Sequence, residues 1–421
     1  MSEVKNEISA ELFPEAEGVE GDFIPAEHAA EQVFYPEVYS HKIVFPASEY
    51  AERIARLREE MERRGLAGLM VTIPENIYYL CGLDHMGYFA YQALILPKKG
   101  EAVLVTRAME QATVWDQVNG VRHVGYKDHE DPAEVTIDVL RTLGLTRGRI
   151  GLEKAGNFLS FRVAETILEG SSSASWEDSS ELVSELRLIK SPLELECTRR
   201  AAAVSDAMMR VAIDTAGAGV NERQIMAELY RTMILEGGTY PGFVPLVRST
   251  RTIKHEHGTW SDTELEHGDV LFLEMSGCVQ RYHAPIGRLV FIGDSPPGTQ
   301  RTQEICNAAM EAVQERIAPG VKAGDVYGAW QQAVKQAGLS YRRHHCGYTV
   351  GIGFPPSWSG GGVPVSLRPS SDMVLQSGMV FHLMSWLLEA GTGDFFLSDT
   401  AIVTDDGCEL LTSVHRYVTV K

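Results

Sequence analysis

A carboxylate interrupts a hydrophobic run in the second half of the sequence. Glu274 lies in the segment 270–277, whose composition is typical of a buried strand. Burial penalises the charged form of a carboxylate, so Glu274 needs either a cationic partner or a function that uses its shifted pKa. An ion pair with Arg281 or Arg288 would be a purely structural explanation. Acid–base or nucleophilic chemistry in a pocket is the functional one.

Two histidines precede that run. His255 and His257 belong to the segment 254–260, which follows a polar loop at 250–252. The ordinary pKa of an imidazole makes a histidine that reaches a substrate a natural proton shuttle. A surface histidine is the plain alternative, and spacing alone does not choose between the two residues. We expect at most one of them to be catalytic.

A third group of polar residues surrounds His344 and His345. Adjacent side chains diverge, and no acidic residue accompanies the pair at the spacing of a metal site, so loop structure is favoured over metal binding. The glycines Gly351 and Gly353 follow, but neither a dinucleotide fingerprint nor a phosphate-binding loop with its lysine is present. We expect these glycines, which have no side chain, to let another group pack closely against the backbone.

Composition narrows the classes of function. The chain has 421 residues, 44% of them hydrophobic, with 38 Lys+Arg against 57 Asp+Glu and a net charge of −19. This length predicts two or three domains, and the acidic balance argues against nucleic acid and anionic membranes as partners. Six cysteines lie far apart without a paired motif, and we find neither an export signal nor a membrane-spanning run. These features favour a reducing cytoplasm.

The elements that must position these residues form two domains after an irregular acidic arm, 1–44. A helix is expected at 50–64, capped by Ser48 and closed by Gly65, and strands are expected at 67–72, 93–96 and 102–106. This alternation predicts an α/β domain over 45–182. For 183–421 we expect helices at 193–215, 221–237 and 302–317, and strands at 270–276, 287–292 and near 380 and 401. Together these predict an α+β chain.

The linker 184–194, followed by Ala201-Ala202, resembles the start of the catalytic domain in the prolidase, aminopeptidase P and creatinase clan, which has the pita-bread fold. In the peptidases of that clan, the resemblance implies five metal ligands: two Asp, a His and two Glu. At the matching positions this sequence has Glu274, Pro285, Val350, Met384 and Asp399. Pro, Val and Met offer no hard donor, so we expect no metal, no cofactor and no peptidase chemistry.

Further blocks resemble the ectoine hydrolases of that clan. These are 272–278 with 281–285, 347–352 with 355–358, 366–369, and 381–384. The sequence departs from their pattern in its acidic arm, in an insertion near 360–363, and at Asp399, where a Glu is expected. The resemblance implies a metal-independent hydrolase that opens the cyclic amidine of a small zwitterion to an N-acetyl diamino acid.

The resemblance also implies roles for individual residues. Glu274 would attack the amidine carbon or deprotonate a water, and His257 would move the proton. The other expected substrate-binding residues are Arg368 for the carboxylate, Phe89, Trp358 and Trp386 against the planar cation, Tyr282, Tyr348 and His382 to orient Glu274 or a water, and Asp399. The clan implies a homodimer, with Phe89 of each subunit acting in the site of the other.

Two other functions stay open at this point. One is a creatinase-like amidinohydrolase acting on another guanidino or amidine acid. The other is a binding protein that kept the pita-bread cup and lost catalysis. A buried Glu274 together with His257 favours an enzyme, because a protein that merely binds a carboxylated cation needs no proton shuttle. A peptidase that recruits metal through other residues is a minor third possibility.

Overall fold

The computed structural model describes residues 44–118, 120–341, 343–360, 365–389 and 393–421, and all of them belong to one compact unit. The predicted acidic arm, apart from Val44, lies outside the described residues. None of the described helices combines the length and the apolar composition that crossing a bilayer requires.

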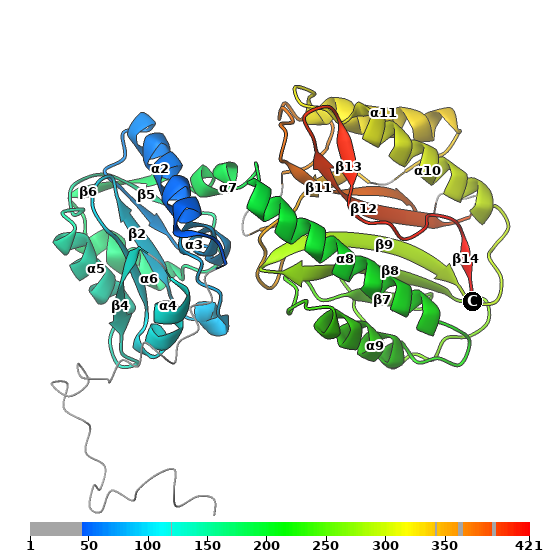
Figure 1. The fold of residues 1–421 in the computed structure, drawn as a ribbon, viewed down its shortest axis with the longest axis horizontal. Helices are drawn as coiled ribbons and strands as arrows, with labels where there is room; N and C mark the ends of the chain where they lie inside the picture. The colour runs from blue at the N-terminus through cyan, green and yellow to red at the C-terminus, as the bar shows by residue number, and fades with distance from the viewer. Residues whose placement is uncertain (1–43, 119, 342, 361–364, 390–392) are drawn as a thin grey trace, which may run out of the picture. The chain divides into compact units, whose positions relative to one another are not determined.

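The first half of the described chain builds a mixed six-stranded sheet (Figure 1). Its strands are β1 (Gly68–Val71), β2 (Ala93–Pro97), β3 (Ala102–Arg107), β4 (Val121–Tyr126), β5 (Gly148–Leu152) and β6 (Ala174–Asp178). The spatial order is β4-β3-β2-β1-β5-β6, and β2 runs antiparallel to both of its neighbours. The strands predicted near 67–72, 93–96 and 102–106 are therefore confirmed as β1, β2 and β3.

Helices surround this sheet. They are α2 (Ala47–Arg63), α3 (Pro74–Cys81), α4 (Gln111–Gln117), α5 (Pro132–Thr142), α6 (Phe161–Gly170) and α7 (Leu182–Leu186), with 3-10 turns η1 (Met86–Phe89) and η2 (Ala108–Glu110). The predicted cap of α2 is wrong, because the helix starts earlier with Pro46 at its N-cap and Ser48 lies inside its first turn. Its predicted end is confirmed, since Gly65 follows with a φ of 69°.

The second half repeats one order of elements, two helices followed by three strands. The first set is α8 (Pro192–Thr215), α9 (Glu222–Leu235), β7 (Leu246–Ser249), β8 (Val270–Val279) and β9 (Tyr282–Phe291). The second set is α10 (Thr299–Arg316), α11 (Ala323–Gln336), β10 (Gly347–Thr349), β11 (Val380–Leu387) and β12 (Phe395–Val403). The short strands β13 (Cys408–Leu410) and β14 (Thr419–Val420) complete the sheet, whose main order is β10-β11-β12-β9-β8-β7.

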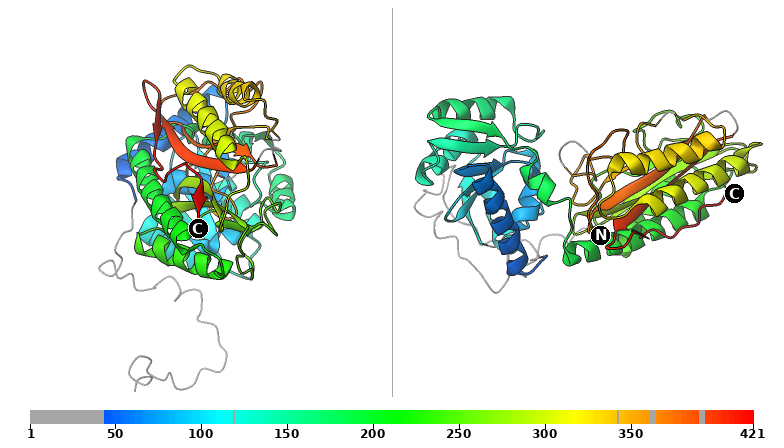
Figure 2. Two further views of the ribbon diagram at one scale, coloured as in Figure 1. Left: turned by 90° about the vertical axis from the view of Figure 1, so that its right-hand side faces the viewer. Right: turned by 90° about the horizontal axis from the view of Figure 1, so that it is seen from above.

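Each helix pair packs on its own strands. Helix α8 lies along β8 and β9, and α10 lies on β11 and β12, as the green and yellow helices of Figures 1 and 2 show. Strand β9 begins five residues before the predicted 287. The prediction started late because His283 and Pro285 interrupt the hydrophobic pattern, although every residue of the strand is buried. The predicted α+β class is confirmed: a mixed sheet with helices precedes a largely antiparallel sheet with paired helices.

The pleat of β8 places Glu274. Successive side chains of a strand point to opposite faces, and Leu271, Leu273 and Met275 pack into the core beneath α8 and α9. Phe272 and Glu274 therefore face the other side of the sheet, where Phe272 joins the core under α10 and α11. Glu274 is paired across the ladder with Gly287 and Leu246.

Candidate active site

Glu274 lines a cavity of about 380 Å³ in the second domain. The predicted residues His257, Tyr348, Trp358 and Trp386 line the same cavity. They come from the β7–β8 loop, from β10, from the segment after β10 and from β11. The structure thus brings together five residues that are far apart in the sequence, in a space of a size that is common for small-molecule sites.

The carboxylate of Glu274 has no structural ion pair of the kind considered from the sequence. Both candidate arginines pair with other carboxylates: Nε of Arg281 lies 3.7 Å from Oδ1 of Asp84, and Nη2 of Arg288 lies 2.9 Å from Oδ1 of Asp399. Glu274 is 6% exposed, and burial raises its pKa to about 7, although Arg248 and Arg343 act in the opposite direction. Near neutral pH this group is thus a stronger base than an ordinary carboxylate and is still ionised in a large fraction of molecules.

A hydrogen-bonded row of side chains forms the wall beside Glu274. The indole Nε1 of Trp358 donates to the hydroxyl of Tyr348 at 2.9 Å, and that hydroxyl lies 2.9 Å from Nδ1 of His382. Nε2 of His382 lies 2.7 Å from Oγ of Ser398 and 3.8 Å from Glu274. Burial lowers the pKa of His382 to about 3, so its imidazole is neutral and fixes the row through hydrogen bonds rather than charge.

The loop between β7 and β8 supplies His257. Its ring lies 5.9 Å from that of Phe243, which packs in turn at 5.0 Å against Trp358. The side chain is exposed, so it faces both the cavity and solvent. His255 is not among the lining residues, and its backbone carbonyl accepts a hydrogen bond from Arg248. The structure therefore distinguishes the two histidines, which their spacing in the sequence did not.

Three predicted substrate residues are placed elsewhere. Arg368 is exposed after β10 and does not line the Glu274 cavity. The hydroxyl of Tyr282 donates to Glu194 at 2.8 Å, so it orients that carboxylate and not Glu274. Phe89 is 78% exposed in η1 and is absent from the cavity wall of its own chain. Its role in a partner's site stays a prediction.

Asp399 has a structural environment that the sequence did not reveal. Its carboxylate is fully buried and contacts Arg288 at 2.9 Å and Arg416 at 2.7 Å. The hydroxyl of Thr412 donates a further hydrogen bond at 2.8 Å. Every contact described for the group ties β12 to β9 and to the C-terminal segment, which favours a structural role, and substrate binding by Asp399 stays an untested prediction.

We therefore expect Asp399→Asn to reduce stability and not substrate binding. Removing one partner of a buried pair leaves two guanidinium groups without their shared anion, which costs about 3–5 kcal/mol. Urea unfolding should show this loss, while KM measured below the unfolding transition stays within about twofold of the wild type. A large rise of KM at unchanged stability would instead restore Asp399 to the substrate site.

Sequence reasoning missed several residues of the cavity, above all Arg343. Its guanidinium lies 3.9 Å from the centroid of the Trp386 ring and forms an ion pair with Glu256 at 2.8 Å. His345 also lines the cavity, and burial together with Arg343 lowers its pKa to about 4. The sequence did contain a signal for Arg343, since this charged residue directly precedes His344 and His345. Those two histidines were considered only as possible metal ligands.

The positions that hold metal in the peptidases of the clan do not form a donor set here. Pro285 faces Ser276 across the ladder, Val350 packs with Trp358, and Met384 lines the Glu274 cavity. Asp399 is held by its two arginines. In the part of the chain that the structure describes, no three His, Cys, Asp or Glu side chains are grouped to hold a metal ion. These residues do not fit a dinuclear metal centre.

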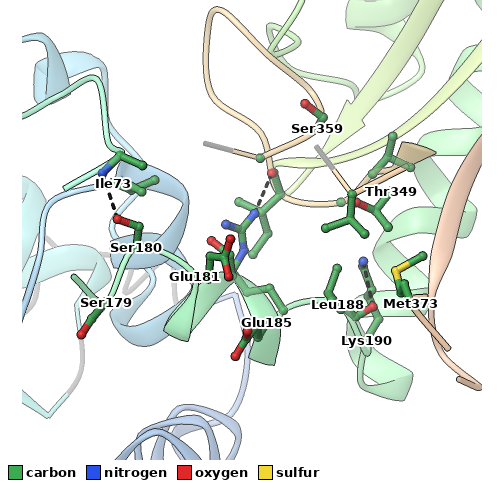
Figure 3. Close-up of a pocket in the computed structure, with 18 of the residues that line it drawn as sticks. Ile73, Ser179, Ser180, Glu181, Glu185, Leu188, Lys190, Thr349, Ser359 and Met373 are labelled. Carbon is green, nitrogen blue, oxygen red and sulfur yellow. Dashed lines mark hydrogen bonds between the residues drawn. The ribbon is translucent and has the colours of Figure 1, made fainter. Parts of the chain in front are cut away.

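A second, larger cavity of about 590 Å³ lies beside the linker (Figure 3). Its wall includes Ser180, Lys190 and Thr349, and Tyr282 also reaches it. The buried amine of Lys190 donates to the carbonyl of Leu188 at 3.1 Å, and burial lowers the pKa of Lys190 to about 8. Glu274 does not line this cavity, and Ser359 belongs to the walls of both cavities.

Comparisons with known proteins agree with this architecture. Residues 53–189 match the creatinase/prolidase N-terminal domain, and residues 196–405 match metallopeptidase family M24. The chain is 30% identical to the ectoine hydrolase of Halomonas elongata, over 90% of this chain and 98% of that protein. It is 23% identical to an Xaa-Pro dipeptidase of Pyrococcus furiosus, over 87% and 99% of the two chains.

Solved structures show the same fold. A prolidase from Thermococcus sibiricus superposes with a TM-score of 0.80 at 22% identity, covering 89% of this chain and all of the other. The pita-bread fold expected from the linker is thereby confirmed. Because the match to the ectoine hydrolase spans nearly the full length of both proteins, the chain belongs to metallopeptidase family M24, with a creatinase-like N-terminal domain, and is a hydrolase of that family.

Proposed function

We propose that this hydrolase opens the ring of ectoine, or of a close relative, without a metal ion. The product would be an N-acetyl diaminobutyrate. The observation that carries the proposal is Glu274, a buried carboxylate with a raised pKa that faces a small cavity and shares it with His257. Similarity to the Halomonas elongata protein supports the choice of substrate.

The chemistry needs an oxygen nucleophile and a proton donor. An oxygen of Glu274, or of a water that Glu274 deprotonates, forms a bond to the amidine carbon. One ring carbon–nitrogen bond then breaks, and the departing nitrogen takes a proton from His257. Where Glu274 itself attacks, a water then adds to the same carbon and the bond to the Glu274 oxygen breaks, which restores the carboxylate. Overall one water is consumed, its oxygen becomes the acetyl carbonyl oxygen, and the released nitrogen becomes an amine.

The cavity suits a planar cation. A negative charge on Glu274 stabilises an amidinium far more strongly in a buried site than in water. Trp358 and Tyr348 supply aromatic surface around it, and aromatic faces attract cations, whereas the ring of Trp386 is stacked by the guanidinium of Arg343. The residues at the metal positions of the clan do not fit metal ions, which leaves the attack to Glu274.

We also propose that the protein acts as a homodimer. The support is Phe89, a large aromatic side chain that is 78% exposed at the end of η1, close in sequence to the exposed Met86. A second copy would cover this side chain and could bring it to the cavity of its partner.

The direct test is NMR of purified protein with ectoine in the presence of a chelator. We expect the ring methyl signal to be replaced by an acetyl signal at an unchanged rate after metal removal. Turnover of creatine or another guanidino acid in place of ectoine would favour the amidinohydrolase. Binding without turnover would favour a non-catalytic protein, and activity that returns only with added metal would favour a prolidase-like peptidase.

A further inference from the structure

The cavity around Glu274 contains a cation that is held in place from two sides. The guanidinium of Arg343 lies over the ring of Trp386, and its Nη2 donates to Oε2 of Glu256 at 2.8 Å. All three residues line the cavity. Stacking on an indole restricts a guanidinium to one plane and leaves its edge directed sideways, which is the orientation that binds carboxylates.

The ion pair with Glu256 is suited to exchange. The Glu256 side chain is 61% exposed and that of Arg343 is 26% exposed. Pairs this accessible contribute little to stability, because water solvates both groups almost as well. A guanidinium has five N–H donors in a planar fork, more than one exposed carboxylate can use. A second carboxylate in the cavity can thus replace Glu256 at small cost.

Other cations near the site are poorly placed for this task. Among the described residues that line this cavity, Arg343 is the only Arg or Lys. Arg248 is fully buried over the ring of Phe272 and is not part of the wall. Arg368, the residue expected from the sequence, is exposed outside it.

We infer that Arg343 recognises the carboxylate of the substrate and that Glu256 is an internal competitor which the substrate displaces. The inference rests on the proposed function and adds a specificity rule to it. Glu274 receives the cationic amidine and Arg343 receives the anionic end, so the cavity selects zwitterions. A cyclic amidine without a carboxylate lacks the group that Arg343 binds.

The test compares ectoine with 2-methyl-1,4,5,6-tetrahydropyrimidine, the same ring without the carboxylate. In Arg343→Gln we expect KM for ectoine to rise about 10²-fold, with kcat reduced less than about tenfold. Measured above about pH 8, where the loss of Arg343 changes the ionisation of Glu274 least, kcat/KM for the carboxylate-free ring should stay within about threefold, which also shows that the variant is folded. Arg343→Lys should restore part of the loss, and Glu256→Gln should lower KM for ectoine.

Equal losses of kcat/KM for both compounds would overturn the inference, since Arg343 would then act on Glu274 or on folding. An unchanged KM for ectoine in Glu256→Gln would show that Glu256 does not compete with the substrate carboxylate for Arg343. If the wild type hydrolyses neither compound, the proposed function fails, and calorimetry of ectoine binding decides the inference by itself. An equal Kd in wild type and Arg343→Gln would then reject it.

Discussion

Glu274→Gln is expected to abolish ring opening, with kcat at least about 10³-fold lower than in the wild type. The amide has the shape of the carboxylate, but it neither attacks carbon nor removes a proton from water. The measurement is NMR of ectoine with a chelator present. In the wild type the ionisation of the same group should make kcat/KM rise with pH up to about 7.

Stability provides the control for this variant. Burial raises the pKa of Glu274 from its ordinary value of 4.5 to about 7, so the folded state binds the proton more tightly than the unfolded state. The contribution of Glu274 to stability is therefore present below about pH 4.5 and is lost as the pH rises through about 7. Relative to the wild type, Glu274→Gln should gain up to about 3 kcal/mol between about pH 5 and pH 8.

An inactive Glu274→Gln protein that is also much less stable at about pH 8 would point to misfolding rather than to a lost nucleophile or base. If the variant stays active, a group other than Glu274 must attack the amidine carbon or activate the water. We expect Glu274→Gln to lose activity and gain stability together, because the same burial that makes the carboxylate reactive also penalises its charge in the folded state.

The hydrophobic periodicity of the chain predicted helices α2, α8, α9 and α10 and several buried strands, but not the other helices. Strands β1 to β3 and helices α8 and α9 lie within a few residues of their expected bounds. The exceptions have local causes. Ser48 has the side chain of a cap, but the fixed φ of Pro46 lets the helix begin earlier. The predicted range of strand β9 was too short because Pro285 interrupts the hydrophobic pattern, although the whole strand is buried by tertiary packing.

The candidate site was predictable where a residue conflicts with its surroundings. Glu274 conflicts with a hydrophobic strand, which is visible in the sequence, and its location in the cavity follows from the pleat. Arg343 and Arg368 are both ordinary arginines in loops, and only the fold shows that Arg343 reaches the cavity wall. The ion pairs of Asp399 were not predictable, because its partner Arg416 comes from a segment whose path the sequence does not reveal.

His257→Ala is expected to lower kcat by about 10²–10³-fold while KM changes little. The departing ring nitrogen is a poor leaving group unless it receives a proton as its bond to carbon breaks. In the described part of the cavity wall, the other histidine is His345, whose pKa of about 4 leaves it neutral at physiological pH. A ring that is unprotonated at this pH has no imidazolium proton to give to the departing nitrogen, so we expect His257 and not His345 to supply it.

The matched control is His255→Ala, which alters the same exposed loop two residues away. Arg248 bonds the backbone carbonyl of His255 and not its ring, so this variant keeps that contact and should retain activity. Because the side chain of His257 is exposed, imidazole added to the buffer should restore part of the rate of His257→Ala. Equal losses in both variants, without rescue, would show that the loop matters as a unit and that no single imidazole transfers the proton.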